Sequence, residues 1–330
     1  MSNNTNFEHI PQEKFRFVQM DAQLHDKRLE TKSRSFFQDA LLRFSKNKSS
    51  VVAAWILAFL VLFALVSPLL SPYSINDKDK LYINYPSYVP SIAKLHIGIM
   101  DGGKVHSSQN ETSMNYWKGI AQETGMDPVL GVVKENVSTV KYRGQMVERK
   151  TYDLNVNRYF ELGIVYRVFS YAEFQRIQDW QDETGIQVIY PYVDPADIGG
   201  SADTPNIWYQ VDGSGSAILD ADGNLQPVYC TNKALEGAEY NSLRIAGDDG
   251  SYIYSAKKSG SVQARVCYYN YYQYLNGHEP SYVFGTTAMG QDLFAAVGIG
   301  ARFSLIFALL VSAINLTIGA IYGAIQGYYG

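Results

Sequence analysis

Residues that could carry chemistry are sparse in this sequence. One short run, Asp220-x-Asp222-Gly223-Asn224, is similar to the start of a calcium-binding loop, in which oxygen ligands alternate along the chain. The bidentate acid that such a loop needs further on is missing. Because Asp-Gly is also a strong hairpin signal, we interpret the run as a turn and keep calcium binding as the alternative.

Motifs of common enzyme sites are missing from the sequence as well. It holds no GxxxxGK(S/T) phosphate loop, no HExxH zinc motif and no GxSxG nucleophile elbow, and its five histidines are scattered. We therefore expect no enzyme, no catalytic residue, no metal site and no cofactor. The net charge of -4 also argues against a nucleic-acid partner, which needs a basic face.

The two cysteines, Cys230 and Cys267, lie in the part of the chain that we expect outside the cell, for reasons given with the orientation of the chain. An oxidising compartment permits a disulfide, and closing a loop of this size would stabilise the fold by roughly 3–4 kcal/mol in the chain-entropy model. We predict a Cys230–Cys267 disulfide, with two buried thiols as the alternative.

Two long stretches without charge set the organisation of the chain. Residues 49–76 and residues 303–330 each run for 28 residues without Asp, Glu, Lys or Arg. About 20 apolar residues in a helix span roughly 30 Å, which is the hydrocarbon thickness of a bilayer. We predict a first transmembrane helix over 50–72 and a second, with its end, over 303–330. A core helix would carry charges along one edge, and a signal peptide would begin nearer the N-terminus.

The second stretch carries a pattern typical of helix packing. Gly319, Gly323 and Gly327 are four residues apart and share one helix face, which lets another helix come close. The alternative is that glycines are simply frequent in membrane helices. Asn315 would lie at mid-membrane depth, so we expect its amide to face protein.

Charge asymmetry predicts the orientation. Five Lys or Arg residues lie between positions 32 and 48 with one acid, Asp39, whereas the residues after the first stretch show no net bias. By the positive-inside rule the N-terminus is cytoplasmic, and two spans return the C-terminus to that side. The segment between them carries a net charge of -8 and lies outside. The sequence therefore predicts a multi-pass protein of the plasma membrane.

Residues 1–49 form the predicted cytoplasmic segment. From Ser35 onward apolar residues recur at helical spacing, with Gln38, Asp39, Arg43 and Lys46 on the other side. We predict an amphipathic helix there, lying on the inner membrane surface or packed on a cytosolic partner; the pattern favours neither.

Residues 73–284 have the composition of a folded extracytoplasmic domain. Ser170-xx-Glu173 is a capping box that predicts a helix from Tyr171 to Thr184, closed by Gly185. The flanking runs 164–169 and 186–192 are typical of strands, and a second helix is predicted over about 113–124. Asp212-Gly213, Asp222-Gly223 and Asn276-Gly277 are hairpin signals. The predicted fold class is an α-helical membrane protein with two spans and a large α+β extracytoplasmic domain inserted between them.

Tyrosine is unusually frequent, at 26 residues, and five tyrosines crowd into residues 268–274. Tyrosine suits ligand-binding surfaces, strands and membrane interfaces alike. We predict that this run packs in the domain, with direct ligand contact as the alternative.

The last 46 residues hold the most specific patterns. The run Gly285-Thr286-Thr287-Ala288-Met289-Gly290-Gln291-Asp292 is followed by Gly300-Ala301-Arg302-Phe303-Ser304-Leu305 and later by Gly327-Tyr328-Tyr329-Gly330. This resembles the membrane-spanning permease subunit of oligopeptide and dipeptide ABC importers, which reads G-T-D-x-x-G-R-D, then G-A-R-x-S-L, and closes its second span near G-Y-Y-G. The basic stretch and first span over residues 32–72 are similar to that family too, and residues 285–302 then form an interfacial segment leading into the membrane.

The resemblance implies a permease component that works by alternating access. The implied partners are a second permease subunit, an extracellular peptide-binding protein, membrane lipid and, when the complete permease is made, two cytoplasmic ATPase subunits. Thr287 and Gln291 replace the family's Asp and Arg, so no role of that charge pair carries over. The family has about six spans and an ATPase-docking EAA loop that this sequence lacks. We therefore expect an N-terminal part of such a permease; the alternative is a two-span receptor or binding protein with an external domain.

Overall fold

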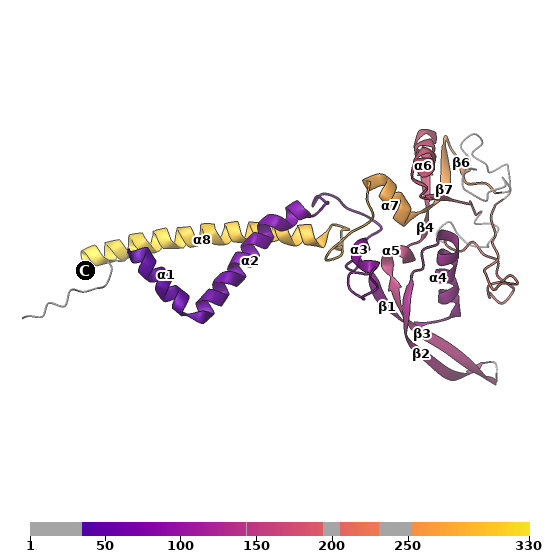
Figure 1. The fold of residues 1–330 in the computed structure, drawn as a ribbon, viewed down its shortest axis with the longest axis horizontal. Helices are drawn as coiled ribbons and strands as arrows, with labels where there is room; N and C mark the ends of the chain where they lie inside the picture. Colours follow the sequence, from indigo (N-terminus) through magenta and orange to yellow (C-terminus); the bar gives the residue numbers. More distant parts are fainter. Residues whose placement is uncertain (1–34, 143, 194–204, 231–251) are drawn as a thin grey trace, which may run out of the picture. The chain divides into compact units, whose positions relative to one another are not determined.

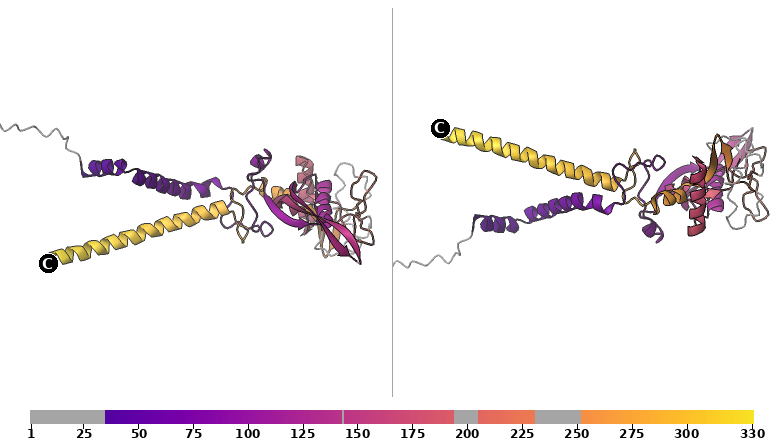
Figure 2. Two further views of the ribbon diagram at one scale, coloured as in Figure 1. Left: turned by 90° about the horizontal axis from the view of Figure 1, so that it is seen from below. Right: turned by 90° about the horizontal axis from the view of Figure 1, so that it is seen from above.

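The computed structural model describes residues 35–142, 144–193, 205–230 and 252–330. Most of the predicted cytoplasmic segment, residues 1–34, lies outside the described residues. Contacts divide the chain into a unit of residues 1–59 and a unit of residues 60–330, and each is described by itself. Figures 1 and 2 follow the elements from the N-terminus to the C-terminus.

The first unit contains helix α1 (Phe36–Lys46) and the beginning of helix α2 (Lys48–Leu70). Ser35 caps α1, because its hydroxyl accepts a hydrogen bond from the Gln38 backbone N–H. No residue of α1 is buried, and the rings of Phe36 and Phe37 contact each other edge to face. The helix predicted after Ser35 is confirmed.

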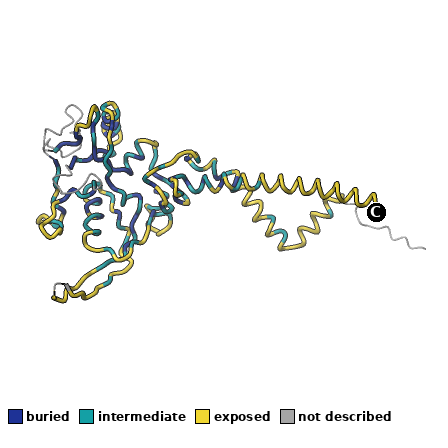
Figure 3. The backbone as a smooth tube through the Cα atoms, turned by 180° about the vertical axis from the view of Figure 1, so that it is seen from behind, coloured by how far each residue is buried: buried dark blue, intermediate teal, exposed yellow. Residues whose placement is uncertain are grey.

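The second unit contains the end of α2 and the long helix α8 (Leu293–Tyr329). Both helices are long and apolar enough to cross a membrane, as predicted from the uncharged stretches. Helix α8 begins ten residues before the predicted second span at 303, because the Asp292 carboxylate caps its N-terminus. The side chains along most of α8 are exposed in this chain (Figure 3).

In the described part of the chain, two antiparallel sheets are formed by strands that lie between α2 and α8 in the sequence (Figure 1). In the first sheet the strand order is β1-β3-β2, and strands β2 and β3 continue as a two-stranded ribbon. In the second, β7 pairs with β4, β5 and β6. The strands are β1 (Gly103–Gln109), β2 (Val129–Tyr142), β3 (Gln145–Asn157), β4 (Ile164–Phe169), β5 (Ile189–Tyr190), β6 (Ala256–Lys258) and β7 (Ser261–Cys267).

Among the described residues, five helices accompany these sheets: α3 (Pro90–Ala93), α4 (Glu111–Thr124), α5 (Arg158–Glu161), α6 (Tyr171–Thr184) and α7 (Tyr268–Asn276). Helix α6 has the predicted bounds, since Ser170 caps its first turn and Gly185 adopts the left-handed conformation after its last. Helix α4 begins two residues before the predicted start, because Asn110 provides the cap.

The predicted turns have two different outcomes. At Asp212 and Asp220 the carboxylates accept backbone N–H groups of the next residues, and the chain reverses as predicted. Asn276-Gly277 is not a hairpin: Gly277 closes helix α7 in a left-handed conformation. The strand predicted over 186–192 is limited to β5.

A tyrosine cluster forms the largest buried core among the described residues of the second unit. Its ten tyrosines are Tyr73, Tyr82, Tyr85, Tyr88, Tyr159, Tyr190, Tyr268, Tyr269, Tyr272 and Tyr282. The tyrosine run of α7 contributes to this core, so its predicted packing role is confirmed. Burial raises the pKa of Tyr85 and Tyr88 to about 12, so both hydroxyls stay protonated at neutral pH.

A buried ion pair joins helix α4 to strand β7. Arg265 on β7 binds both carboxylate oxygens of Glu123 on α4, at 2.7 and 2.8 Å. Its remaining donors reach the backbone oxygens of Pro191 and Pro205. A charged pair this deeply buried is tolerated because all its partners are supplied.

The structure does not support the predicted disulfide. Cys230 and Cys267 are buried thiols in different clusters. The backbone N–H of Cys267 bonds to Val188, whereas that of Cys230 bonds to Tyr192.

Candidate functional site

The family-like run 285–292 forms a compact loop that we call the junction loop, because it joins the segment after α7 to α8. Gly285 opens it with a φ of 82°, and a Cβ there would overlap the Tyr85 backbone oxygen. Thr286 and Tyr85 exchange hydrogen bonds, the threonine hydroxyl accepting from the Tyr85 N–H at 2.9 Å. The loop is therefore fastened to the segment that follows α2, about 200 residues earlier in the chain.

Gly290 makes the second attachment of the junction loop. Its backbone oxygen accepts from the Asp79 N–H at 3.0 Å, and a Cβ on Gly290 would overlap the Asp79 backbone oxygen. Its φ of 71° is also a conformation that side-chain-bearing residues rarely adopt. Both conditions require glycine at this position.

Asp292 ends the loop and starts helix α8. Its two carboxylate oxygens accept from the backbone N–H groups of Phe294 and Ala295, in the geometry of a helix cap. The Ser71 hydroxyl donates to the same carboxylate at 2.6 Å. One buried side chain thus joins the start of α8 to the residue after α2.

The two departures from the family pattern have a structural explanation. The Thr287 hydroxyl accepts from the backbone N–H groups of Met289 and Gln291, both at 3.2 Å. The Gln291 amide donates to the backbone oxygen of Ile75 at 2.5 Å. Two neutral side chains therefore supply the hydrogen bonds of the loop, and no charge pair is needed to close it.

Helices α2 and α8 come into contact directly below the junction loop. A Cβ at Gly298 would overlap the Ser67 hydroxyl and lie 3.0 Å from the Pro68 ring, so glycine permits this close approach. Phe63 and Phe294 add an edge-to-face contact at 5.6 Å.

Arg302 supplies a hydrogen bond that α2 lacks. Pro68 has no backbone N–H, so the Ala64 carbonyl four residues earlier has no donor within the helix. The Arg302 Nε donates to that carbonyl at 2.6 Å, and its Nη2 donates to the Leu65 carbonyl. An arginine in an apolar helix is costly unless it has such partners, and here they fix the arginine to the turn of α2 that contains Pro68.

The other predicted site residues lie apart from this contact. A Cβ on Gly300, Gly319, Gly323 or Gly327 would meet nothing within 4 Å, and Asn315 is exposed. Their roles stay predictions. Ala301 lies beside Arg302 on α8 and is half-buried.

The described residues contain no group of three or more His, Cys, Asp or Glu side chains arranged to hold a metal ion. The Asp220 run, considered above for calcium, uses its first carboxylate to accept the backbone N–H groups of Asp222 and Asn224.

Sequence reasoning named Arg302 by its motif but not its partner, and it missed Gly298. Two signals were present in the sequence. Pro68 in the first apolar stretch creates an unpaired carbonyl, and Gly298 precedes Arg302 by one helical turn.

Comparison with known proteins supports a transporter relationship for the N-terminal part. Residues 35–87 match the family model of the N-terminal TM domain of oligopeptide transport permease C. The chain is 48% identical over 52 residues to the oligopeptide transport system permease protein OppC of Haemophilus influenzae, which covers 16% of this chain and 17% of that protein. It is 42% identical over 57 residues to the dipeptide transport system permease protein DppC of Lactococcus lactis subsp. cremoris, with 16% and 17% covered.

A third relative, the oligopeptide transport system permease protein OppC of Bacillus subtilis, is 36% identical over 59 residues, with 17% of this chain and 19% of that protein covered. The chain thus spans about a sixth of the length of the curated relatives it matches. No solved structure matches the chain. The predicted resemblance to the permease subunit of oligopeptide and dipeptide importers is confirmed.

Proposed function

We propose that this chain supplies two spans of the membrane permease of an ABC importer for oligopeptides or dipeptides. One observation carries the proposal. The segment that matches the permease model, residues 35–87, is fastened through Ser71, Asp79 and Tyr85 to the junction loop, whose motif resembles the same family. Two family-like parts far apart in sequence therefore meet in space.

In this proposal residues 73–284 are an extracytoplasmic α+β domain inserted between the spans. The insertion is sterically simple, because the two ends of the domain are paired: Tyr88 and Tyr282 exchange backbone hydrogen bonds at 2.9 and 2.7 Å. Neighbouring ends let a domain be added to a loop without moving the helices that carry it. This supports an enlarged external loop rather than a rearranged permease.

The N-terminus is cytoplasmic in this proposal, and the protein is a multi-pass protein of the plasma membrane. The expected partners are a second permease subunit, two ATPase subunits, an external peptide-binding protein and lipid at the exposed apolar face of α1. We expect no nucleic-acid partner, and the role is transport rather than catalysis.

Single-cysteine labelling in intact cells tests the orientation. An impermeant maleimide should label Lys150→Cys, whose side chain is 56% exposed, and should not label His25→Cys until the membrane is opened. If position 25 alone were labelled in sealed cells, the orientation would be the opposite of the one proposed.

Peptide uptake tests the function itself. A strain without the gene should lose uptake of a labelled tripeptide, and the wild-type gene should restore it. The protein as expressed in its host should co-purify with an ATPase of the ABC class. Unchanged uptake in the deletion strain together with no ATPase partner would overturn the proposal and leave a two-span receptor as the better explanation.

A further inference from the structure

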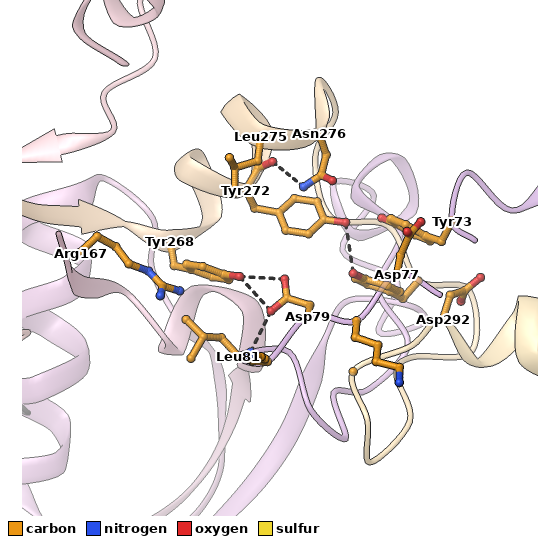
Figure 4. Close-up of a pocket in the computed structure, with 14 residues that line it drawn as sticks. Tyr73, Asp77, Asp79, Leu81, Arg167, Tyr268, Tyr272, Leu275, Asn276 and Asp292 are labelled. Carbon is orange, nitrogen blue, oxygen red and sulfur yellow. Dashed lines mark hydrogen bonds between the residues drawn. The ribbon is translucent and has the colours of Figure 1, made fainter. Parts of the chain in front are cut away.

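A cavity of about 620 Å³ lies beside the junction loop (Figure 4). Its wall comes from the segment after α2, from β4, from α7 and from the loop itself. The volume is in the range of pockets that enclose small ligands. The cavity lies next to Asp292, so a ligand held in it would rest where the domain meets the start of α8.

Arg167 on β4 stands at one end of the cavity in Figure 4. Its guanidinium lies over the Tyr268 ring at 5.5 Å, and its buried Nε has no hydrogen-bond partner. None of the ion pairs between described residues involves it. With Tyr268 and Leu275 it also lines an adjoining cavity of about 550 Å³. A planar cation without an anionic partner is suited to bind a carboxylate through two parallel hydrogen bonds.

The three carboxylates that line the cavity differ in how many hydrogen bonds they accept from the protein. Asp79 accepts from the Tyr268 hydroxyl at 2.8 Å and from the Leu81 backbone N–H, and Asp292 caps α8. Asp77 is exposed, and only one of its oxygens accepts a hydrogen bond from a described residue, the Ser74 N–H. Figure 4 places Asp77 at the opposite end from Arg167.

The wall between these ends is aromatic. The hydroxyls of Tyr272 and Tyr282 contact each other at 3.2 Å, and the Tyr73 ring stacks on Tyr282 at 4.6 Å. The Tyr272 and Tyr282 hydroxyls thus use part of their hydrogen-bonding capacity on each other, and the tyrosine rings give the wall an apolar surface. Lys78 and Lys80 balance the acids at the rim, so the six charged groups of the lining sum to zero.

We infer that this cavity binds a short peptide with free termini, whose carboxylate lies on the Arg167 guanidinium and whose ammonium faces Asp77. The chemistry at the two ends has opposite charge, which matches a zwitterion. A phosphate or other small dianion would gain at Arg167 but be repelled at Asp77. Two or three extended residues reach about 7–10 Å.

This inference deepens the proposed function, on which it rests for the link to import, by giving the domain a peptide site of its own. Its test needs no transport. The full-length protein in lipid nanodiscs is dialysed against labelled trialanine, for wild type, Arg167→Gln and Asp77→Asn. Arg149→Gln, an exposed arginine on the β2–β3 ribbon, is the matched control, and thermal melting checks that each variant is folded.

We expect saturable trialanine binding that Arg167→Gln weakens about tenfold or more and that Arg149→Gln leaves unchanged. Trialaninamide, which lacks the carboxylate, should bind wild type as weakly as trialanine binds Arg167→Gln. Asp77→Asn should weaken trialanine but not N-acetyltrialanine.

Three results would overturn the inference. They are no saturable trialanine binding to folded wild type, an affinity of Arg167→Gln for trialanine equal to that of wild type, or displacement of trialanine by equimolar phosphate. Failure of the proposed function is distinguishable from these. It would show as normal uptake in a strain that lacks the gene, even if the purified protein bound trialanine through Arg167.

Discussion

Removing the Arg302 side chain should loosen the contact between α2 and α8, and the loss should depend on Pro68. Arg302 donates two charge-assisted hydrogen bonds to carbonyls of α2, one of them the Ala64 carbonyl that Pro68 leaves without a donor. Such bonds contribute about 1.5–3 kcal/mol each in water-soluble proteins and rather less inside membranes. We therefore expect Arg302→Leu to destabilise the protein by about 2–4 kcal/mol.

Pro68→Ala tests the mechanism, because it returns a backbone N–H that can bond to the Ala64 carbonyl. In the Pro68→Ala background Arg302→Leu should cost less, giving a coupling free energy of about 1–2 kcal/mol in a double-mutant cycle. The measurement is SDS titration of the purified full-length protein in mild detergent, followed by circular dichroism.

A matched cycle with Pro72→Ala provides the control. Pro72 lies beyond the end of α2 and is exposed, so its coupling to Arg302 should be close to zero. If the free-energy effects of the Pro68 and Arg302 substitutions were additive within about 0.5 kcal/mol, the arginine would not be replacing the hydrogen bond that Pro68 removes from α2. That result would refute the reasoning.

Four further predictions concern other parts of the chain. Glu123→Ala leaves the buried Arg265 charge without its partner and should cost about 3–5 kcal/mol, measured by chemical denaturation, whereas a loss below about 1 kcal/mol would contradict the buried-pair account. Cys230 and Cys267 are both buried, and burial raises the pKa of Cys267 to about 12, so the two thiols should alkylate only after denaturation and without reductant; a disulfide-linked peptide in the digest would contradict this. The folded-state pKa of Tyr88 is about 12 against 10.0 for an ordinary tyrosine, so its stabilisation is complete below pH 10.0 and is lost as the pH rises toward 12; tyrosinate absorbance that titrates at pH 10.0 without unfolding would oppose it. Gly323→Leu should leave insertion intact but weaken co-purification with a partner permease, and equal recovery would mean that the glycine is incidental.

The sequence by itself determined the elements whose causes are local. The helix of residues 171–184 is specified by Ser170 at one end and Gly185 at the other, and both act within one turn. The two apolar helices follow from uncharged runs alone, because burial in lipid depends on composition rather than on a particular neighbour. The motif around Gly285 marked a family, but not what its residues contact.

Only the tertiary structure decided the contacts between residues distant in sequence. The Arg302 bond to Ala64, the close approach of Gly298 to Ser67 and the lack of a partner for the Arg167 Nε depend on how segments far apart in the sequence are brought together. Local patterns carry no information on such distances, so the expected oxidising compartment suggested a bridge between two cysteines that the structure holds as separate buried thiols. The hairpin prediction at Asn276-Gly277 was wrong for the same reason. The helix that precedes it, α7, is stabilised by packing in the tyrosine cluster, which the local sequence does not reveal.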